Sequence, residues 1–391
     1  MDPAELRELL SPEGLRLLDE VGPIASGVDV LRSVSRLRAA GHSGTLVAAV
    51  LGQARLRAKG VAKFGDFASR MLFTPEGLEQ ATRLRVAALH AGRFAEAGVD
   101  VVADLGCGIG ADAMAFAALD LGVVAVERDE VTAAVATYNL SPFSSAQVEL
   151  GDAESADLSA VGGVWLDPAR RDGDRRLDDP ALWSPSLDWA FGIAGDQPTG
   201  IKLGPGLDRD LIPENCEAQW VSVDREVVEL VLWFGAVARS GIHRAALVLN
   251  DTGSHELTAE AAGADVEVAP LGRYLLEPDG AVIRARLIGD LARRLDGRMI
   301  DPTIAWITCD EPPQTPFGQA FEVVERFPLD VKTLKRELGL RDIGVLEVKK
   351  RGVDIDPATF RHKLGLRGSK SATLILTRVA GDRVALLADR L

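Results

Sequence analysis

The feature of this sequence that most restricts its fold is an alternation of short apolar runs with segments of helical pattern. The apolar runs lie at 99–106, 122–129, 146–152, 162–168 and 199–206. Helical patterns at 111–120 and 131–140 separate the first three runs. A strand, a helix and a second strand in that order form the βαβ unit, which builds parallel sheets. The sequence therefore predicts an α/β fold with an open, Rossmann-like sheet.

The segments on either side of this alternation have different patterns. Residues 1–95 carry Leu, Ala and Arg at helical spacing and predict an N-terminal helical region. Within them, Thr74 followed by Pro75 is typical of a helix start, so we expect one helix from there to about Arg93. Residues 217–250 contain longer apolar runs, which we expect to be antiparallel strands that complete the sheet.

The rest of the chain predicts two further parts beyond a sheet domain at 96–250. Residues 251–321 are interpreted as a connecting region. Within it, 277–295 indicates a turn followed by an amphipathic helix, and the Pro-rich 309–319 indicates a linker or an ordered loop. Residues 322–391 alternate strand and helix patterns and predict a small C-terminal α+β domain.

Charge is distributed unevenly along the 391 residues, a length that suggests two or three domains. The formal net charge of −14 by itself argues against a nucleic-acid partner. Residues 322–391 nevertheless contain 15 Lys and Arg against 10 Asp and Glu. A basic terminal domain on an acidic body indicates a polyanionic partner, and the alternative is an ordinary solvated surface.

Several classes of protein are excluded by what the sequence lacks. No run of about 18 apolar residues occurs, so we expect no membrane span. Residues 1–20 carry acids from the second position and no apolar core, unlike a secretory signal, and we expect a cytoplasmic protein. The three cysteines lie singly and the five histidines have no ligand spacing, so neither a disulfide framework nor a metal site is predicted. The oligomeric state stays open.

The sharpest motif is the glycine-rich segment 104–110, DLGCGIG, where a predicted strand runs into a predicted helix. Glycines there let the backbone turn tightly and approach a ligand, and the helix start presents unpaired N–H groups. A dinucleotide fingerprint would use Gly106, Gly108 and Ala111. Asp104, however, would repel a pyrophosphate and attract a cationic amino-acid tail. The motif therefore favours S-adenosylmethionine over a dinucleotide.

Two further carboxylates follow the next strands in order. Glu127 closes the second predicted strand, where a carboxylate can accept both ribose hydroxyls, although NAD would use the same feature. Asp152 follows the third strand, where the adenine would lie. The alternative is that both acids cap ordinary turns. Their positions at the ends of successive strands favour the cofactor interpretation.

With these acids and glycines in place, residues 97–170 resemble a class I S-adenosylmethionine-dependent methyltransferase. The resemblance implies a Rossmann-like seven-stranded methyltransferase sheet, with the cofactor across the carboxyl edge. The residues that it implies for cofactor binding are Asp104, Gly106, Cys107, Gly108, Gly110, Glu127, Arg128, Asp152 and Ala153.

The fourth predicted strand ends in Asp167-Pro168-Ala169-Arg170. In methyltransferases that act on exocyclic nucleobase amines, this position commonly carries Asp or Asn, then Pro, Pro and an aromatic residue. Asp167 and Pro168 match the first two positions, which implies a carboxylate that orients the amine on a loop stiffened by proline. Ala169 and Arg170 depart from the pattern and remove the stacking ring. Arg170 is expected instead to hold a phosphate, to stack on a base, or to pair with a following acid.

The segment 73–76, Phe-Thr-Pro-Glu, resembles a segment ahead of the methyltransferase domain in trimethylguanosine synthases. There the preceding helix folds over the cofactor, which implies that Phe73 and Thr74 contact S-adenosylmethionine. The alternative is a plain helix start that needs no ligand.

Residues 322–391 resemble the THUMP-like domain that follows methyltransferase domains in bacterial proteins, through the segments 345–357 and 371–379. True THUMP domains associate with RNA, chiefly tRNA, which implies an RNA partner here. The basic residues expected to meet phosphates are Lys349, Lys350, Arg351, Arg361, Lys363 and Arg367. Because the segment lacks the paired aromatic residues of an RNP surface, docking to a protein or within the chain is the alternative.

The leading hypothesis is an enzyme that uses S-adenosylmethionine to methylate a nucleobase nitrogen in tRNA or rRNA. The acidic body permits a second hypothesis, a small-molecule or protein methyltransferase. The departure at Ala169 and Arg170 supports a third, a non-catalytic protein that binds S-adenosylmethionine or RNA. An NAD oxidoreductase is the fourth, and Asp104 argues against it.

Overall fold

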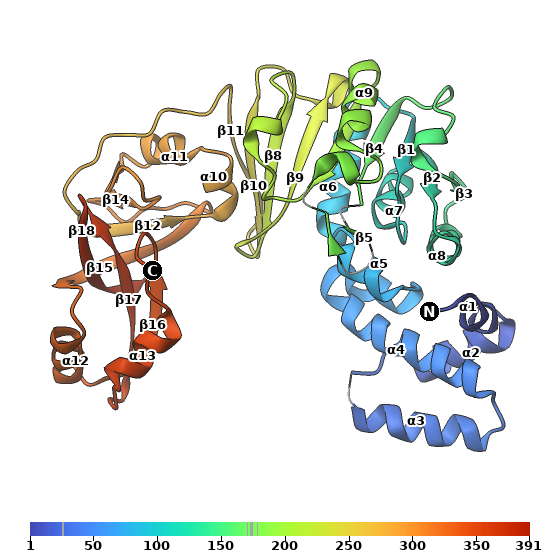
Figure 1. Ribbon diagram of the computed structural model, residues 1–391, viewed down its shortest axis with the longest axis horizontal. Coiled ribbons are helices and arrows are strands. Elements are labelled where there is room, and N and C mark those ends of the chain that lie inside the picture. The colour runs from blue at the N-terminus through green and yellow to red at the C-terminus, as the bar shows by residue number, and fades with distance from the viewer. Residues whose placement is uncertain (26, 170, 173–174, 178) are drawn as a thin grey trace. The chain divides into compact units, whose positions relative to one another are not determined.

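The computed structural model describes the whole chain except residues 26, 170, 173, 174 and 178 (Figure 1). The chain divides into two compact units: unit 1 is Met1–Lys202 with Trp233–Ala238, and unit 2 is Leu203–Leu232 with Arg239–Leu391. The sequence predicted four parts, at 1–95, 96–250, 251–321 and 322–391. Their boundaries stay a prediction, because the two units divide the chain differently.

Unit 1 begins with helices, as predicted for residues 1–95. They are α1 (Pro3–Leu9), α2 (Pro12–Val21), α3 (Gly27–Ala39), α4 (Gly44–Phe64), α5 (Pro75–Gln80) and α6 (Leu84–Glu96). The side chains of Asp2, Ser11 and Ser43 accept backbone N–H groups and thereby cap α1, α2 and α4. Helices α1, α2 and α3 contact α4, so α4 is the centre of this helical core (Figure 1).

The segment predicted as a single helix, 74–93, is instead two helices with a break at Ala81. Ala81 has a ψ of 138°, which is incompatible with an α-helix. Within the break, the Thr82 hydroxyl donates to the Asp112 carboxylate at 2.7 Å. A hydrogen bond to a distant residue therefore accompanies the interruption of a segment whose local propensity favours one helix.

The predicted strands of the alternation are confirmed in unit 1. They are β1 (Val101–Leu105), β2 (Gly122–Glu127), β3 (Ala146–Leu150), β4 (Gly163–Leu166) and β7 (Thr199–Leu203), with a separate short pair β5 (Arg171–Asp172) and β6 (Arg175–Arg176). All neighbours in the order β3-β2-β1-β4-β7 pair in parallel. The helices between them are α7 (Ala111–Ala118), α8 (Glu130–Leu140) and α9 (Leu187–Asp196) (Figure 1). Because β2 and β4 flank β1, the strand order reverses at β1, where open α/β sheets bind ligands.

An aromatic cluster anchors β4 in the core of unit 1. The centroid of the Trp165 ring lies 4.4 Å from that of His90 and 5.7 Å from that of Trp233. Gly200 of β7 gives the cluster its space, since a Cβ there would come within 2.7 Å of the Trp165 ring. This packing holds β4 directly ahead of Asp167.

Unit 2 contains β8 (Glu217–Val223), most of β9 (Glu226–Phe234), β10 (Arg244–Asn250) and β11 (Gly253–Ala259), in the order β11-β10-β8-β9. Asp224 and Arg225 join β8 to β9 with φ values of 50° and 70°, as in a type I′ hairpin turn. The prediction of antiparallel strands is wrong for β8 and β10, which pair in parallel. Strands β9 and β10 lie on opposite sides of β8, so the chain crosses from one side of β8 to the other between them. Strands β10 and β11 pair antiparallel.

A second sheet fills the rest of unit 2. Its strands, in spatial order, are β13 (Arg298–Met299), β14 (Ile307–Cys309), β12 (Tyr274–Pro278), β15 (Gly318–Pro328), β18 (Asp382–Arg390), β17 (Lys370–Val379) and β16 (Ile343–Lys350). Its helices are α10 (Gly280–Arg284), α11 (Ile288–Arg294), α12 (Val331–Leu340) and α13 (Pro357–Leu364). Strands β12, β13 and β14 come from 251–321, so this region contributes to the same sheet as the C-terminal residues.

The helix expected within 277–295 is also divided. Arg286 has a φ of 60° and ends α10 in a left-handed conformation. The Leu287 N–H donates to the Val282 carbonyl at 3.0 Å, which is the bond of a Schellman motif. This turn keeps Leu287 buried while Arg286 points to solvent.

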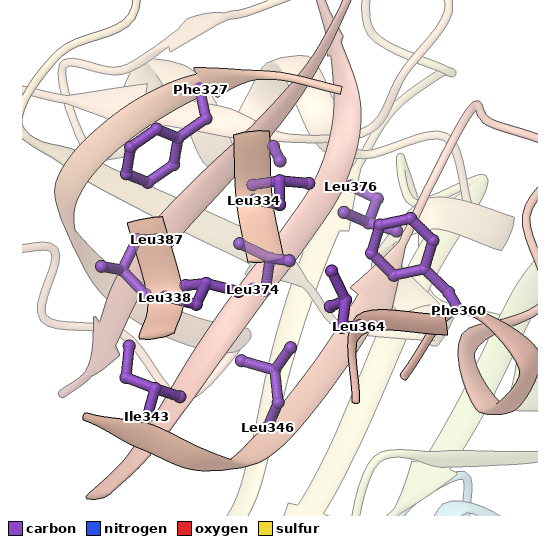
Figure 2. Close-up of a cluster of buried hydrophobic side chains, with 11 residues drawn as sticks. Phe327, Leu334, Leu338, Ile343, Leu346, Phe360, Leu364, Leu374, Leu376 and Leu387 are labelled. Atoms are coloured by element: carbon purple, nitrogen blue, oxygen red, sulfur yellow. The ribbon is translucent and has the colours of Figure 1, made fainter. Parts of the chain in front are cut away.

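The C-terminal part of unit 2 has two hydrophobic clusters on opposite faces of β17. Leu374 and Leu376 pack with Leu334 and Leu338 of α12, as Figure 2 shows. Ile375, which lies between them in sequence, packs in the second cluster. Successive side chains of a strand point to opposite faces, so β17 is buried on both sides. The α+β pattern predicted for 322–391 is confirmed.

Candidate active site

The glycine-rich loop at 106–110 connects β1 to α7 through three left-handed glycines. Gly106, Gly108 and Gly110 have φ values of 83°, 56° and 83°. Side chains disfavour these conformations, so glycine is required at each position. A Cβ on Gly106 would also lie 3.4 Å from the carbonyl oxygen of Asp167. The loop therefore lies against the residue that follows β4.

Glu127 at the end of β2 braces this loop. One carboxylate oxygen accepts the Gly108 N–H at 3.0 Å, and the other accepts the Asp129 N–H at 2.9 Å. A carboxylate has about four acceptor positions, so these bonds leave acceptor capacity for ribose hydroxyls. Arg128, predicted to contact the cofactor, is exposed and donates to the Ser184 hydroxyl at 2.9 Å.

Asp104 is a buried acid with one unsatisfied oxygen. Its residue is 1% exposed, and its Oδ2 has no hydrogen-bond partner among the described residues. Burial raises the pKa of Asp104 well above its ordinary value, and the charges of Asp112 and Asp167 raise it further, while Lys202 opposes them. An orphaned buried carboxylate is stabilised by a cation. The ammonium of S-adenosylmethionine fits this requirement, and a pyrophosphate does not.

A largely buried polar chain, which the sequence did not predict, lies close enough to Asp104 for its charges to act on that acid. Lys202 Nζ lies 2.5 Å from Asp167 Oδ2 and donates to the Thr82 hydroxyl at 2.9 Å. Thr82 in turn donates to Asp112, whose other oxygen lies 2.9 Å from His90 Nδ1. The polar chain therefore links His90 of α6, Asp112 of α7 and Lys202 of β7 to Asp167, which follows β4.

Besides Asp167, which the sequence analysis named, two members of this chain had a signal in the sequence. Lys202 is a charged residue inside an apolar strand run, and Asp112 is the second residue of the helix after the loop. His90 and Thr82 had none, because their partners are distant in sequence. Burial tends to raise the pKa of Asp112, but the hydrogen bond and charge of His90 outweigh it, so the pKa is lowered.

Asp167 and Pro168 follow β4 directly. The Asp167 side chain is 29% exposed and pairs with Lys202, while Pro168 is buried. Ala169 exchanges two backbone hydrogen bonds with Ser184, at 2.8 and 3.2 Å. These bonds fix the backbone directly after Pro168. Arg170 lies outside the described residues, so its predicted contact with the substrate stays a prediction.

The two residues predicted from the trimethylguanosine synthase resemblance have different surroundings. Phe73 is 0% exposed, and its ring packs against Phe64 at 5.6 Å and against Gly60. This is the environment of a core residue. Thr74 caps α5 by accepting the Gly77 N–H at 3.0 Å. Contact of either residue with the cofactor stays a prediction.

The start of α5 is nevertheless held against the glycine-rich loop. A Cβ on Gly77 would come within 2.4 Å of Ile109. The Asn139 side chain donates to the carbonyls of both Leu72 and Ile109, at 3.0 and 2.9 Å. The segment ahead of α5 therefore shares an anchor with the loop.

The remaining predicted cofactor residues are Asp152, Ala153 and Cys107. Asp152 is exposed and accepts the Glu154 N–H at 2.9 Å, which caps the short 3-10 helix Ala153–Ser155. Its predicted place beside the adenine stays a prediction. Burial, followed by the charges of Asp104 and Glu127, raises the pKa of the Cys107 thiol. The thiol therefore favours its neutral form, and the predicted contacts of Cys107 and Ala153 with the cofactor stay predictions.

The basic residues predicted for the C-terminal domain are partly engaged within unit 2. Lys349 pairs with Glu277 at 2.7 Å, and burial lowers the pKa of Arg351. Lys350, Arg361, Lys363 and Arg367 are exposed. Among the described residues, no helix is long and apolar enough to span a membrane. In the same residues, no cluster of His, Cys, Asp or Glu side chains is arranged to hold a metal ion.

Parts of the chain, and its fold as a whole, are similar to known proteins. A family described as THUMP domain-like matches residues 318–390, and a domain of unknown function (DUF8688) matches residues 2–60. The crystal structure of a candidate methyltransferase from Porphyromonas gingivalis W83 covers 100% of this chain and 99% of its own, with a TM-score of 0.73. Its sequence identity is 19%, so it supports the fold alone.

A relative in Mycobacterium tuberculosis is more similar in sequence. This protein, named an uncharacterized S-adenosylmethionine-dependent methyltransferase in strains CDC 1551 and H37Rv, is 33% identical over 339 residues. The alignment covers 84% of this chain and 92% of the relative. At that identity and coverage, the chain belongs to the family of S-adenosylmethionine-dependent methyltransferases.

Proposed function

We propose that this protein methylates a nucleobase nitrogen in RNA, tRNA or rRNA, in the cytoplasm. The observation that carries the proposal is Asp167, followed by Pro168 at the end of β4. It is held by Lys202 at 2.5 Å, and its carbonyl lies against Gly106 of the glycine-rich loop. A carboxylate in that place meets an amino group brought to the cofactor.

The residues around the loop fit the two charged groups of the methionine end of the cofactor, its ammonium and its carboxylate. Asp104 would hold the ammonium, since its Oδ2 has no partner among the described residues. The N–H groups at the start of α7 suit a carboxylate, because a helix start is electropositive. Glu127 would accept the ribose hydroxyls. When bound, S-adenosylmethionine supplies a methyl group carried on its sulfonium. After the transfer, the rest of the cofactor leaves as a neutral thioether.

The acceptor side of the reaction depends on Asp167. Its carboxylate would accept hydrogens of the exocyclic amine and aim the nitrogen lone pair at the methyl carbon. Lys202 restricts the carboxylate to one orientation, and Pro168 limits the backbone. Methyl transfer is a displacement whose rate depends mainly on alignment, so fixed positioning supplies much of the acceleration.

An RNA substrate is supported by the second unit. The THUMP domain-like match covers 318–390, and residues 322–391 carry 15 Lys and Arg against 10 Asp and Glu. A cationic domain attached to a catalytic unit increases the local concentration of a polyanionic substrate.

The test is transfer of labelled methyl from S-adenosylmethionine into separate RNA, protein and metabolite fractions. We expect label in RNA, and digestion to nucleosides then identifies the methylated nitrogen. Label in the protein or metabolite fraction would contradict an RNA substrate and support the second hypothesis, a small-molecule or protein methyltransferase. No label in any fraction, with the cofactor bound, would favour a non-catalytic binding protein.

The role of Asp167 is tested by Asp167→Asn and Asp167→Ala. Because both remove the carboxylate that aligns the amine, we expect transfer to fall by at least ~100-fold. Calorimetry should show that the cofactor still binds, which also verifies folding. Asp188→Asn, an exposed acid of α9, is the matched control and should keep full activity. Near-normal transfer by Asp167→Asn would contradict the assigned role.

A further inference from the structure

Four arginines of unit 2 converge from parts of the chain that are distant in sequence. Arg209 lies in the short 3-10 helix Arg209–Leu211, Arg244 begins β10, and Arg284 and Arg286 are at the end of α10. They meet because α10 contacts both β8 and β10.

Hydrogen bonds to backbone carbonyls hold part of this cluster in place. Arg209 Nε donates to the carbonyl of Arg284 at 3.2 Å, and Arg284 donates to the carbonyl of Pro205 at 2.9 Å. Arg244 lies over the Trp220 ring, 5.9 Å from its centroid. A guanidinium has five N–H donors, so these bonds leave donors directed to solvent.

The four cations repel one another and lack acidic partners. Burial lowers the pKa of Arg209, and the charges of Arg286, Arg284 and Arg244 lower it further, against the opposing effect of Asp208. In the described part of the chain, none of the four forms an ion pair with a carboxylate. Arg239 and Arg273, elsewhere in unit 2, do form such pairs.

This arrangement is unusual in a chain of net charge −14, where acids are abundant. A compact group of unpaired arginines is destabilised by its own repulsion, and a ligand with several negative charges relieves that repulsion. Arginine forks also match phosphate oxygens. A single small anion would meet one or two of the guanidinium groups, whereas a phosphodiester chain offers successive charges.

We propose that Arg209, Arg244, Arg284 and Arg286 form a binding site for the phosphodiester backbone of RNA. The inference rests on the proposed function, because it takes RNA as the substrate. It differs from the sequence prediction, which placed the phosphate contacts at Lys349, Lys350, Arg351, Arg361, Lys363 and Arg367. All four arginines precede residue 318, where the THUMP domain-like match begins.

The test compares full-length variants of equal charge. Arg209→Gln with Arg286→Gln removes two exposed members of the cluster, while Arg294→Gln with Arg383→Gln removes two exposed arginines elsewhere in unit 2. A third variant, Lys363→Gln with Arg367→Gln, tests the C-terminal residues predicted from the sequence. Binding is measured by fluorescence anisotropy with a labelled single-stranded RNA of mixed sequence, over a series of NaCl concentrations.

We expect the cluster variant to bind RNA roughly tenfold more weakly at low salt, with a dependence of log Kd on log salt reduced by about 1.4, since each single-strand phosphate contact contributes about 0.7. The Arg294 and Arg383 control should match the wild type. Unchanged calorimetric binding of S-adenosylmethionine to the variants verifies that unit 1 is folded.

Two negative results are distinguishable. If the wild type binds and methylates RNA while the cluster variant keeps the salt slope of the control, the arginine site is wrong and the proposed function stands. A reduced slope confined to the Lys363 and Arg367 variant would also overturn the arginine site. If the wild type neither binds nor methylates RNA, the proposed function itself fails.

Discussion

Two groups of charged side chains, one in each unit, have opposite surroundings. In unit 1, Asp104, Asp112 and Lys202 are only 1%, 6% and 8% exposed, and fixed neighbours set their charges. In unit 2, Arg209 and Arg286 are exposed and lie among like charges. A buried charge acts over a few ångströms and depends on exact geometry, whereas exposed charges act over longer distances and are screened by salt. The buried charges of unit 1 therefore suit a reaction site, and the exposed arginines of unit 2 suit the attraction of an anionic ligand.

The largest expected effect tests whether burial makes the charges of unit 1 structurally essential. Asp112→Asn removes the charge that pairs with His90 and disturbs the bond from Thr82, so we expect the free energy of unfolding to fall by about 4 kcal/mol. Arg286→Gln, at the exposed cluster, should change it by less than ~0.5 kcal/mol. Urea unfolding of both variants provides the measurement. Equal effects would remove the contrast between the two units.

The next effect concerns cofactor affinity. Asp104→Asn removes the anion proposed to hold the ammonium, and we expect the Kd for S-adenosylmethionine to rise by about 100-fold. Calorimetry measures it, with Asp157→Asn, an exposed acid of unit 1, as the control. An unchanged Kd would place the ammonium elsewhere.

The same variant has a predicted pH signature. Burial raises the pKa of Asp104, so the folded chain retains a proton at pH values where the unfolded chain has lost it. The free energy of unfolding of the wild type therefore falls as pH rises from the ordinary aspartate pKa towards the raised value. Cofactor-free Asp104→Asn should melt above the wild type at neutral pH, and the difference should shrink towards about pH 4. A difference that grows on acidification would contradict the sign.

The smallest effect refines the role of Lys202 as a positioning residue. Lys202→Met frees Asp167 from its ion pair, and we expect kcat to fall by about tenfold because the carboxylate is less well aligned. Cofactor affinity should not weaken. Lys202 is a cation near Asp104 and repels the ammonium proposed to bind there, so its removal does not cost attraction. Single-turnover kinetics and calorimetry separate the two quantities. Weaker cofactor binding with an unchanged kcat would assign Lys202 to the cofactor instead.

Much of the fold followed from local pattern. The strands β1, β2, β3, β4 and β7 lie at the predicted apolar runs, and residues 322–391 alternate strands and helices as their pattern indicated. Apolar periodicity and glycine position are properties of neighbouring residues, so the sequence shows them directly. The predictions failed at Ala81 in 74–93 and in the parallel pairing of β8 with β10, where distant residues are involved. They also failed at Arg286 in 277–295, where a local turn ends α10.

The sequence alone determined that a glycine-rich turn follows an apolar strand, with Asp104 ahead of it and further acids after the next strands. Only the tertiary structure decided which charges lie close together. Asp167 meets Lys202, Asp112 meets His90, and the four arginines of unit 2 meet one another across gaps of many residues. The reason is physical: hydrophobic periodicity is written in consecutive residues, whereas the energy of a charge depends on the dielectric and the partners that packing brings around it.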